Sequence, residues 1–240
     1  MTYGKFTAKN GVYKTSQEKI NHPAKYSDAF IPIFAEELKG KRKVLDPFAG
    51  TGKIGEIKRF GYDGVVYAND IEPEWIELGR NKCDVISAVD AERLPDIYPP
   101  MFFDAICTSP TYGNRMADHH NAKDGSKRNT YTHTLGHALT DGNTGKMQWG
   151  EEYRKKHTRI YANIVPLLSN DGVFILNISD HIRKGEEVPV SAWHIETLEA
   201  LGMKLEEDIH IPTPRCKYGA NANIRVEYEH IYVLKICRLI

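Results

Sequence analysis

Residues Val44 to Gly52, V-L-D-P-F-A-G-T-G, form a short apolar run that leads directly into two glycines, and a helical pattern begins near Lys53. Glycine has no Cβ, so the backbone at Gly50 and Gly52 can come close to a bound ligand. The helix start that follows presents free N–H groups. The stretch therefore predicts a strand, a tight turn and a helix at a ligand site, although G-x-G alone also fits a nicotinamide nucleotide, a flavin or a plain turn.

Asp46 narrows the choice of ligand. A carboxylate at the end of the strand repels a pyrophosphate and suits a cationic group such as an amine, so it favours a cofactor that carries an amino acid over a dinucleotide. A Walker-type phosphate loop is excluded, because no G-x-x-x-x-G-K-[ST] pattern occurs in the chain. The predicted cofactor contacts in this turn are Asp46, Phe48, Ala49, Gly50, Thr51 and Gly52.

Outward from this stretch, short β-branched and aromatic runs alternate with longer helical patterns. The runs expected as strands are Lys43 to Leu45, Gly64 to Ala68, Phe103 to Cys107, Val173 to Ile178, Lys204 to Ile211 and Glu227 to Ile236. The helical patterns are Asp28 to Leu38, Tyr153 to Leu168 and Ala192 to Leu201. This alternation predicts a doubly wound α/β sheet, mostly parallel, with an antiparallel C-terminal strand. Residues 1–240 are expected to form one domain with an inserted region at about 113–150.

Acidic residues follow the next two predicted strands. Asp70 lies about 20 residues after the glycine turn, where an acidic side chain accepts hydrogen bonds from both hydroxyls of a ribose. Glu72 competes for this role, although its place before Pro73 equally suits a helix start. Asp90 follows a short apolar run and is expected either to take the exocyclic amine of an adenine or to cap a helix. The neighbouring residues expected to contact the same cofactor are Ile71 and Ala91.

The fourth strand, F-F-D-A-I-C, leads into S-P-T-Y, Ser109 to Tyr112. With D-P-F-A-G-T-G, N-D-I-E-P and D-A-E-R-L-P before it, this segment resembles the S-adenosylmethionine-dependent amino-methyltransferases, which methylate exocyclic amines of adenine or cytosine in DNA. Their motif is Asp, Asn or Ser, then Pro-Pro and an aromatic residue, so three of the four positions match and Thr111 replaces the second proline. The resemblance covers roughly residues 20 to 115. It implies a Rossmann-like class I methyltransferase fold and S-adenosylmethionine as the cofactor.

The resemblance also implies roles for single residues. In the family, a side chain and a backbone carbonyl at the strand end accept the amine hydrogens, and here these groups are the hydroxyl of Ser109 and the carbonyl of Pro110. Tyr112 is then expected to stack on a base that has left the duplex. The segment H-P-A-K-Y-S resembles the part of the family beside the methionine end of the cofactor. Its expected contacts are His22, Lys25 and Tyr26.

The expected function is therefore site-specific methylation of DNA at N-4 of cytosine or N-6 of adenine, the type of activity used in restriction-modification. One alternative is an RNA methyltransferase of the guanine N-2 type, because related enzymes share D-P-F-A-G-T-G and a strand-end proline motif. Another is an inactive methyltransferase-like subunit that binds nucleic acid, which Thr111 favours. The inserted region is small for a separate target-recognition domain, so we expect low sequence specificity, a short target, or a partner that is a second copy of the chain or an auxiliary specificity subunit.

The charge distribution points to a local contact with nucleic acid. Lys+Arg and Asp+Glu both number 32, so no field of the whole molecule draws the chain to nucleic acid or to a membrane. Residues 1–43 carry nine basic and four acidic groups, and residues 111–160 carry nine and five. These basic stretches fit either a surface that faces a polyanion or two solvated loops. The expected nucleic-acid contacts are Arg115, Lys123, Lys127 and Arg128.

Several other classes of protein are disfavoured. No run approaches the roughly 18 apolar residues of a membrane helix, and the first residues are too polar for a signal peptide, so no membrane contact and a cytoplasmic protein are expected. The four cysteines are far apart and form no C-x-x-C pair, which argues against a disulfide framework. The histidines at 119, 120, 133 and 137 lack partners at ligand spacing, so no metal site is expected.

Overall fold

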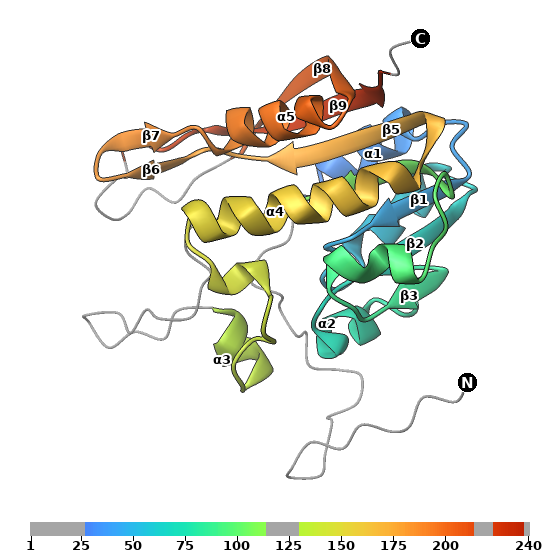
Figure 1. Cartoon of the computed structure of the whole chain (residues 1–240), viewed down its shortest axis with the longest axis horizontal. Helices are drawn as coiled ribbons and strands as arrows, with labels where there is room; N and C mark the ends of the chain where they lie inside the picture. The colour runs from blue at the N-terminus through green and yellow to red at the C-terminus, as the bar shows by residue number, and fades with distance from the viewer. Residues whose placement is uncertain (1–26, 114–129, 214–222, 238–240) are drawn as a thin grey trace.

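The computed structural model describes residues 27–113, 130–213 and 223–237 (Figure 1). Within these ranges lies a seven-stranded sheet with the strand order β3-β2-β1-β4-β5-β9-β8, together with a two-stranded hairpin, β6-β7. The strands are β1 (Lys43–Asp46), β2 (Val65–Asn69), β3 (Val85–Ser87), β4 (Phe103–Thr108), β5 (Leu168–Ile178), β6 (His181–Arg183), β7 (Glu186–Val188), β8 (Met203–Pro212) and β9 (Tyr228–Ile236).

Helices connect the strands. The α-helices are α1 (Phe30–Glu37), α2 (Pro73–Leu78), α3 (Tyr131–Leu135), α4 (Glu151–Ile164) and α5 (Val190–Ala200). The 3-10 helices are η1 (Lys53–Phe60), η2 (Ala91–Asp96), η3 (Thr144–Lys146) and η4 (Val165–Leu167). Among the described residues, no helix combines the length and the apolar character that crossing a membrane requires.

Strands β1 to β5 run parallel, whereas β9 pairs antiparallel with β5, and β8 pairs antiparallel with β9. The predicted sheet, mostly parallel with an antiparallel C-terminal strand, is confirmed. Strands β2 and β3 lie on one side of β1, and β4 lies on the other. The winding therefore reverses next to β1, and the crevice outside the carboxyl ends of strands at such a point is the usual ligand site of an open α/β sheet.

Both faces of the sheet are covered by helices (Figure 1). On β5, Val173 and Ile175 pack in the core formed with α1 and η1, while Phe174 and Leu176 pack in the core formed with η2, α4 and α5. Successive side chains of a strand point to opposite faces. A stretch of strand covered on both sides is therefore apolar on both faces, which explains the apolar run Val173 to Leu176 of β5.

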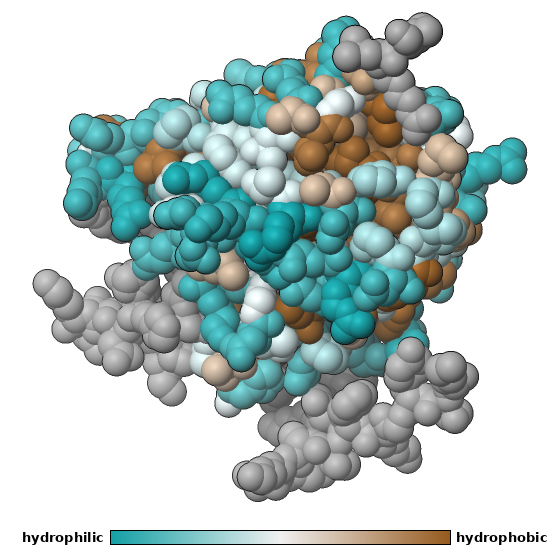
Figure 2. All heavy atoms as spheres, viewed as in Figure 1, coloured by the Kyte–Doolittle hydropathy of each residue, from teal (hydrophilic) through white to brown (hydrophobic). Residues whose placement is uncertain are grey.

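Helix α4 is amphipathic. Its buried residues recur at helical spacing and include Tyr153, Ile160 and Ile164. Its exposed side carries charged residues such as Lys155, which forms an ion pair of 2.6 Å with Glu151 one turn earlier. Figure 2 shows the hydrophilic surface along the N-terminal part of this helix. The charged side faces solvent, so the apolar side is the one that packs on the sheet.

Two regions differ from the sequence prediction. Residues 130–150, expected within a long loop without periodicity, contain α3 and η3. Helices of one turn are too short to show a hydrophobic repeat, so periodicity cannot detect them. The hairpin β6-β7 was not predicted either, because its strands have three residues each.

Candidate functional site

A cavity of about 290 Å³ opens where β1, β2 and β4 end. The predicted site residues that line it are Phe48, Ala49, Gly50, Thr51, Asp70, Ile71, Asp90, Ala91, Ser109, Pro110 and Tyr112. Asp46 and Gly52 are described but do not belong to this lining. The remaining predicted contacts lie outside the described residues: His22, Lys25, Tyr26, Arg115, Lys123, Lys127 and Arg128.

The glycine turn forms one wall of the cavity. Gly50 and Gly52 have φ values of 53° and 67°, which side chains of L-residues rarely allow. A Cβ on Gly52 would also lie 2.9 Å from Cα of Gly79. The backbone N–H of Gly50 donates a hydrogen bond of 2.9 Å to Oδ2 of Asp70, which ties the turn to the end of β2.

Asp70 is held as a half-buried acceptor beside this turn. Its Oδ1 accepts a second backbone hydrogen bond, 2.9 Å from the N–H of Glu72. Burial raises the pKa of the carboxyl to about 7, because loss of water disfavours the charge more than the two backbone N–H groups favour it. A carboxylate oxygen has more than one lone pair, so Asp70 can still accept hydrogen bonds from a ligand.

Asp46 lies under the turn and outside the cavity lining. Its carboxyl is fully buried, and Oδ1 accepts hydrogen bonds from the N–H of Phe48 at 3.0 Å and from Oγ1 of Thr108 at 2.7 Å. Burial raises the pKa of this carboxyl to about 7 as well. The geometry therefore makes Asp46 a support that holds the turn after β1 against the end of β4, and places it outside the cavity lining.

Glu72 anchors the segment that closes the cavity from the other side. Its buried carboxylate accepts hydrogen bonds from the N–H of Thr140 at 2.7 Å, from Oγ1 of Thr140 at 2.8 Å and from Nδ2 of Asn143 at 2.7 Å. Residues 142–145 line the cavity. The sequence suggested two roles for Glu72, a ribose ligand or a helix start. The structure adds a third, because Glu72 holds the segment with Thr140 and Asn143 at the cavity.

Asp90 lines the cavity and also caps η2, as the alternative from the sequence allowed. Its Oδ1 accepts the N–H of Glu92 at 3.1 Å, and its Oδ2 lies 2.6 Å from Nζ of the buried Lys156. Lys156 also lies 3.2 Å from Glu92. An adenine amine would have to share an oxygen of Asp90 with one of these donors.

The S-P-T-Y segment meets β9 at the cavity. The phenol of Tyr112 donates a hydrogen bond of 3.2 Å to Oε2 of Glu229, and Oγ of Ser109 lies 3.4 Å from the phenol oxygen. Since Tyr112 directs its hydrogen to Glu229, Ser109 donates in the second pair and keeps its lone pairs as acceptors. The hydrogens of this Ser109–Tyr112–Glu229 chain all point toward the carboxylate.

A second set of hydrogen bonds, made by three fully buried side chains, ends on the backbone of the S-P-T-Y segment. The phenol of Tyr153 donates to the carbonyl of Thr111 at 2.5 Å and lies 3.0 Å from Nε2 of His194, while the phenol of Tyr161 lies 2.7 Å from Nδ1. Burial lowers the pKa of His194 well below its ordinary value, so the imidazole is neutral. One arrangement satisfies every group: Tyr161 donates to Nδ1, Nε2–H donates to Tyr153, and Tyr153 donates to Thr111.

Some lining residues were missed by the sequence analysis. They are Pro47, Lys53, Trp75, Thr111, Gly113, Tyr131, Gly142, Asn143, Thr144, Gly145, Met147, Ile160 and Glu229. Among them, Glu229 is the one residue with a carboxylate, which can accept a proton. Its only signal in the sequence is an acidic residue within the apolar final strand, V-E-Y-E-H-I-Y-V-L, at a position where burial is costly unless the group has a partner.

The arrangement offers two kinds of acceptor across one cavity. On the side of β1 and β2, the half-buried carboxylate of Asp70 lies against the glycine turn, which suits the hydroxyl groups of a ligand. On the side of β4 and β9, a serine oxygen leads through a phenol to a second carboxylate, which suits the hydrogens of an amine. Phe48, Ile71 and Ala91 supply apolar surface between the two sides.

Comparison with known proteins gives local sequence matches. No family model matches the chain. A tRNA (guanine(10)-N2)-dimethyltransferase from Pyrococcus abyssi is 32% identical over 108 residues, which are 42% of this chain and 32% of that protein. A ubiquinone/menaquinone biosynthesis C-methyltransferase from Chromobacterium violaceum is 36% identical over 88 residues, which are 33% of this chain and 34% of that protein. The chain thus spans about a third of the length of these relatives.

Solved structures match over most of the chain. A SAM-dependent methyltransferase from Archaeoglobus fulgidus has a TM-score of 0.54 and 14% identity, covering 86% of this chain and 91% of that one. A SAM-dependent methyltransferase from Methanosarcina mazei has a TM-score of 0.53 and 12% identity, covering 86% and 97%. The chain has the Rossmann-like fold of class I methyltransferases.

Proposed function

We propose that this chain is an S-adenosylmethionine-dependent methyltransferase that modifies an exocyclic amine of a nucleic-acid base. The observation that carries the proposal is the meeting of the Ser109–Tyr112–Glu229 chain with the glycine turn and Asp70 in one cavity. Proteins that share a fold can have many different activities, so the function is inferred from these side chains.

The residues of the first side fit the cofactor. Asp70 is a half-buried acceptor 2.9 Å from the turn amide of Gly50, which suits the two hydroxyls of a ribose. Ile71 and Ala91 line the cavity next to the strand ends and offer apolar contact to an adenine. S-adenosylmethionine, when bound, supplies a methyl group activated by its positive sulfur. His22, Lys25 and Tyr26 remain the contacts predicted for the methionine end.

The residues of the second side fit the amine. The lone pairs of Ser109 Oγ and the carbonyl of Pro110 accept the amine hydrogens and orient the nitrogen for in-line attack on the methyl carbon. S-adenosylmethionine would supply the methyl carbon for the new carbon–nitrogen bond, and the electron pair of the broken carbon–sulfur bond would stay with the sulfur. The nitrogen then loses one proton. Ser109 takes this proton while its own passes to Tyr112, and the phenol proton passes to Oε2 of Glu229.

The substrate is proposed to be RNA. The match to a tRNA (guanine(10)-N2)-dimethyltransferase supports this choice, since it joins an RNA substrate to methylation of an exocyclic amine. The S-P-T-Y segment supports DNA as the second candidate, because it resembles the DNA amino-methyltransferases. In either case the predicted contacts are Arg115, Lys123, Lys127 and Arg128, which lie outside the described residues. A second copy of the chain or a specificity subunit remains a proposed partner.

Transfer of a labelled methyl group separates these candidates. The full chain is incubated with S-adenosylmethionine carrying a tritiated methyl group, and with either unmodified RNA transcripts or duplex DNA. Label is expected in RNA, and the Ser109→Ala variant should lose it while Ser169→Ala, a serine outside the cavity lining, keeps it. Label in DNA alone would favour the second candidate, and label in neither polymer, or undiminished label with Ser109→Ala, would contradict the proposal.

A further inference from the structure

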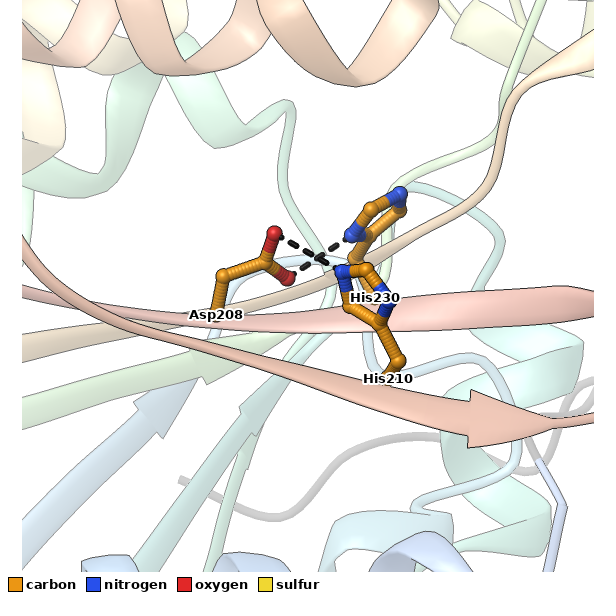
Figure 3. Close-up of side chains that lie close together, drawn as sticks. All are labelled: Asp208, His210 and His230. Atoms are coloured by element: carbon orange, nitrogen blue, oxygen red, sulfur yellow. Dashed lines mark hydrogen bonds and ion pairs between the residues drawn. The ribbon is translucent and has the colours of Figure 1, made fainter.

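Two histidines and a carboxylate meet on one face of the outer strand pair, β8 and β9 (Figure 3). His210 of β8 lies directly opposite His230 of β9, and Asp208 precedes His210 by two residues. Side chains two residues apart on a strand share a face, so all three project to the same side. Oδ1 of Asp208 is 2.8 Å from Nδ1 of His230, and Oδ2 is 3.0 Å from Nε2 of His210.

We propose that Asp208, His210 and His230 bind a zinc ion. One ligand atom from each of the three residues lies within 4.8 Å of the others. Imidazole nitrogen and carboxylate oxygen bind Zn²⁺ at about 2.0 to 2.2 Å in nearly tetrahedral geometry, which places ligand atoms about 3.3 to 3.6 Å apart. Small side-chain rotations separate the present hydrogen-bonded atoms to that spacing. The ion then replaces the hydrogens that the carboxylate now accepts.

The two rings are already oriented. The ring of His210 stacks on Tyr228, with centroids 4.8 Å apart and planes 7° apart, and the ring of His230 stacks on Tyr232 at 4.7 Å and 9°. Ordering a ligand side chain costs conformational entropy when the ion binds, and rings that are already packed lose less of it. The stacking thus favours binding through the nitrogens that now face Asp208.

Exposure decides which part of the site is open. The side chain of His230 is 9% exposed, whereas those of Asp208 and His210 are 34% and 53% exposed. The ion therefore has access from solvent, and a water molecule completes its coordination on the open side. Because Asp208 and His210 are both exposed to solvent, their pairing contributes little to stability.

The zinc site is separate from the cavity. Glu229, the residue before His230, lines the cavity, and alternation along β9 places the two side chains on opposite faces of the strand. The ion would tie the edge strand β8 to β9 and take no part in methyl transfer. The inference does not depend on the proposed function.

Metal titration of the full chain tests the site. The protein is dialysed against a chelator and titrated with zinc sulfate in competition with a chromophoric chelator. Cobalt(II) in place of zinc reports a four-coordinate site through its visible absorption. One zinc per chain is expected, and His210→Ala or His230→Ala should weaken binding by at least about 100-fold, since even the loss of an outer partner costs about 10- to 100-fold.

Two further variants make the result decisive. Asp208→Asn keeps the size of the side chain and should also weaken zinc binding. This variant keeps the test valid if circular dichroism shows that a histidine variant does not fold. His137→Ala removes an exposed histidine that is paired with Glu74 outside the cluster, and should leave binding unchanged. The proposal is overturned if the full chain binds no zinc at micromolar concentration, or if the Asp208 and histidine variants keep its stoichiometry and affinity.

Discussion

The phenol of Tyr112 donates a hydrogen bond of 3.2 Å to Oε2 of Glu229, although the two residues are 117 positions apart in the chain. Tyr112 follows β4, and Glu229 lies near the start of β9. Between these strands in the sheet lies β5, whose Asn177 donates from Nδ2 to the same Oε2 at 3.3 Å. Three strands thus hold one carboxylate at the cavity.

Glu229→Gln should slow methyl transfer by about 100-fold, within the range of a lost proton acceptor. The amide can still accept the hydrogen bond of Tyr112 but cannot take up a proton. Cofactor affinity should be unchanged, because Glu229 lies on the amine side of the cavity. Turnover is measured under saturating cofactor and affinity by calorimetry.

Glu227→Gln is the matched control, since Glu227 is exposed and lies just before β9. It makes the same change of charge and should keep the turnover of the unmodified chain. Equal turnover for Glu229→Gln and Glu227→Gln would remove Glu229 from the mechanism.

Asp70 should make cofactor binding depend on pH. Its pKa is raised to about 7, and the ionised form accepts hydrogen bonds from hydroxyls better than the protonated form. Affinity for S-adenosylmethionine is therefore expected to rise as the pH passes upward through about 7. Asp70→Asn should lower the affinity by about 1 to 3 kcal/mol at pH 8 and flatten this rise. Calorimetric titrations at pH 6 and pH 8 provide the comparison; a variant with unchanged affinity at both would contradict the ribose role.

The carboxyls of Asp70 and Asp46 should make the stability of the folded chain fall as the pH rises, whereas cofactor affinity should rise. Both carboxyls have pKa values of about 7 in the folded chain against an ordinary 3.8, so the folded state binds their protons more tightly than the unfolded state. Their contribution to the free energy of unfolding is thus largest in acid and falls as the pH rises from about 4 to about 7. Denaturant unfolding of Asp46→Asn across this range should show a smaller fall than the unmodified chain. An identical pH profile would mean that Asp46 titrates normally.

The buried chain below S-P-T-Y can be tested with two tyrosines. Tyr161→Phe removes one hydrogen bond to His194 and should cost about 1 kcal/mol of stability, whereas Tyr153→Phe removes two, to His194 and to Thr111, and should cost about twice as much. Tyr153→Phe also frees the carbonyl of Thr111, so it should lower the rate of methyl transfer, while Tyr161→Phe should not. Chemical denaturation and turnover are measured together; equal turnover in the two variants would show that the link to Thr111 does not position the site.

The sequence predicts the parts of the site that depend on neighbours in the chain. Gly50 follows a strand directly, and Asp70 and Ser109 follow the next strands that end at the same edge, so parallel pairing is enough to bring them together. Their place in the cavity lining agrees with this reasoning. In each case the apolar run predicts the strand, and the residue that follows the run is the one that faces the ligand site.

The rest depends on contacts between distant segments. Glu72 binds Thr140 and Asn143, about 70 residues further along the chain, and no periodic pattern marks that pairing. Glu229 similarly looks like an isolated acid within an apolar strand until its contact with Tyr112 is seen. The charge of Asp46 alone suggests a contact with an amine of the ligand. Its burial under the turn depends on the hydrogen bond with Thr108 of the adjacent strand. The helices in residues 130–150 are too short to leave a repeat.

The position of the transferred methyl group on the nucleoside distinguishes methylation of an exocyclic amine from methylation of a ring atom. RNA and DNA treated with the full chain and S-adenosylmethionine are digested to nucleosides, and the products are identified by mass spectrometry against standards methylated on exocyclic nitrogen, ring nitrogen or ring carbon. We expect a nucleoside methylated on its exocyclic amine, a product that the proposed function requires and that Ser109→Ala should abolish. A methyl group found only on a ring atom, or no methylated nucleoside at all, would contradict the proposed function.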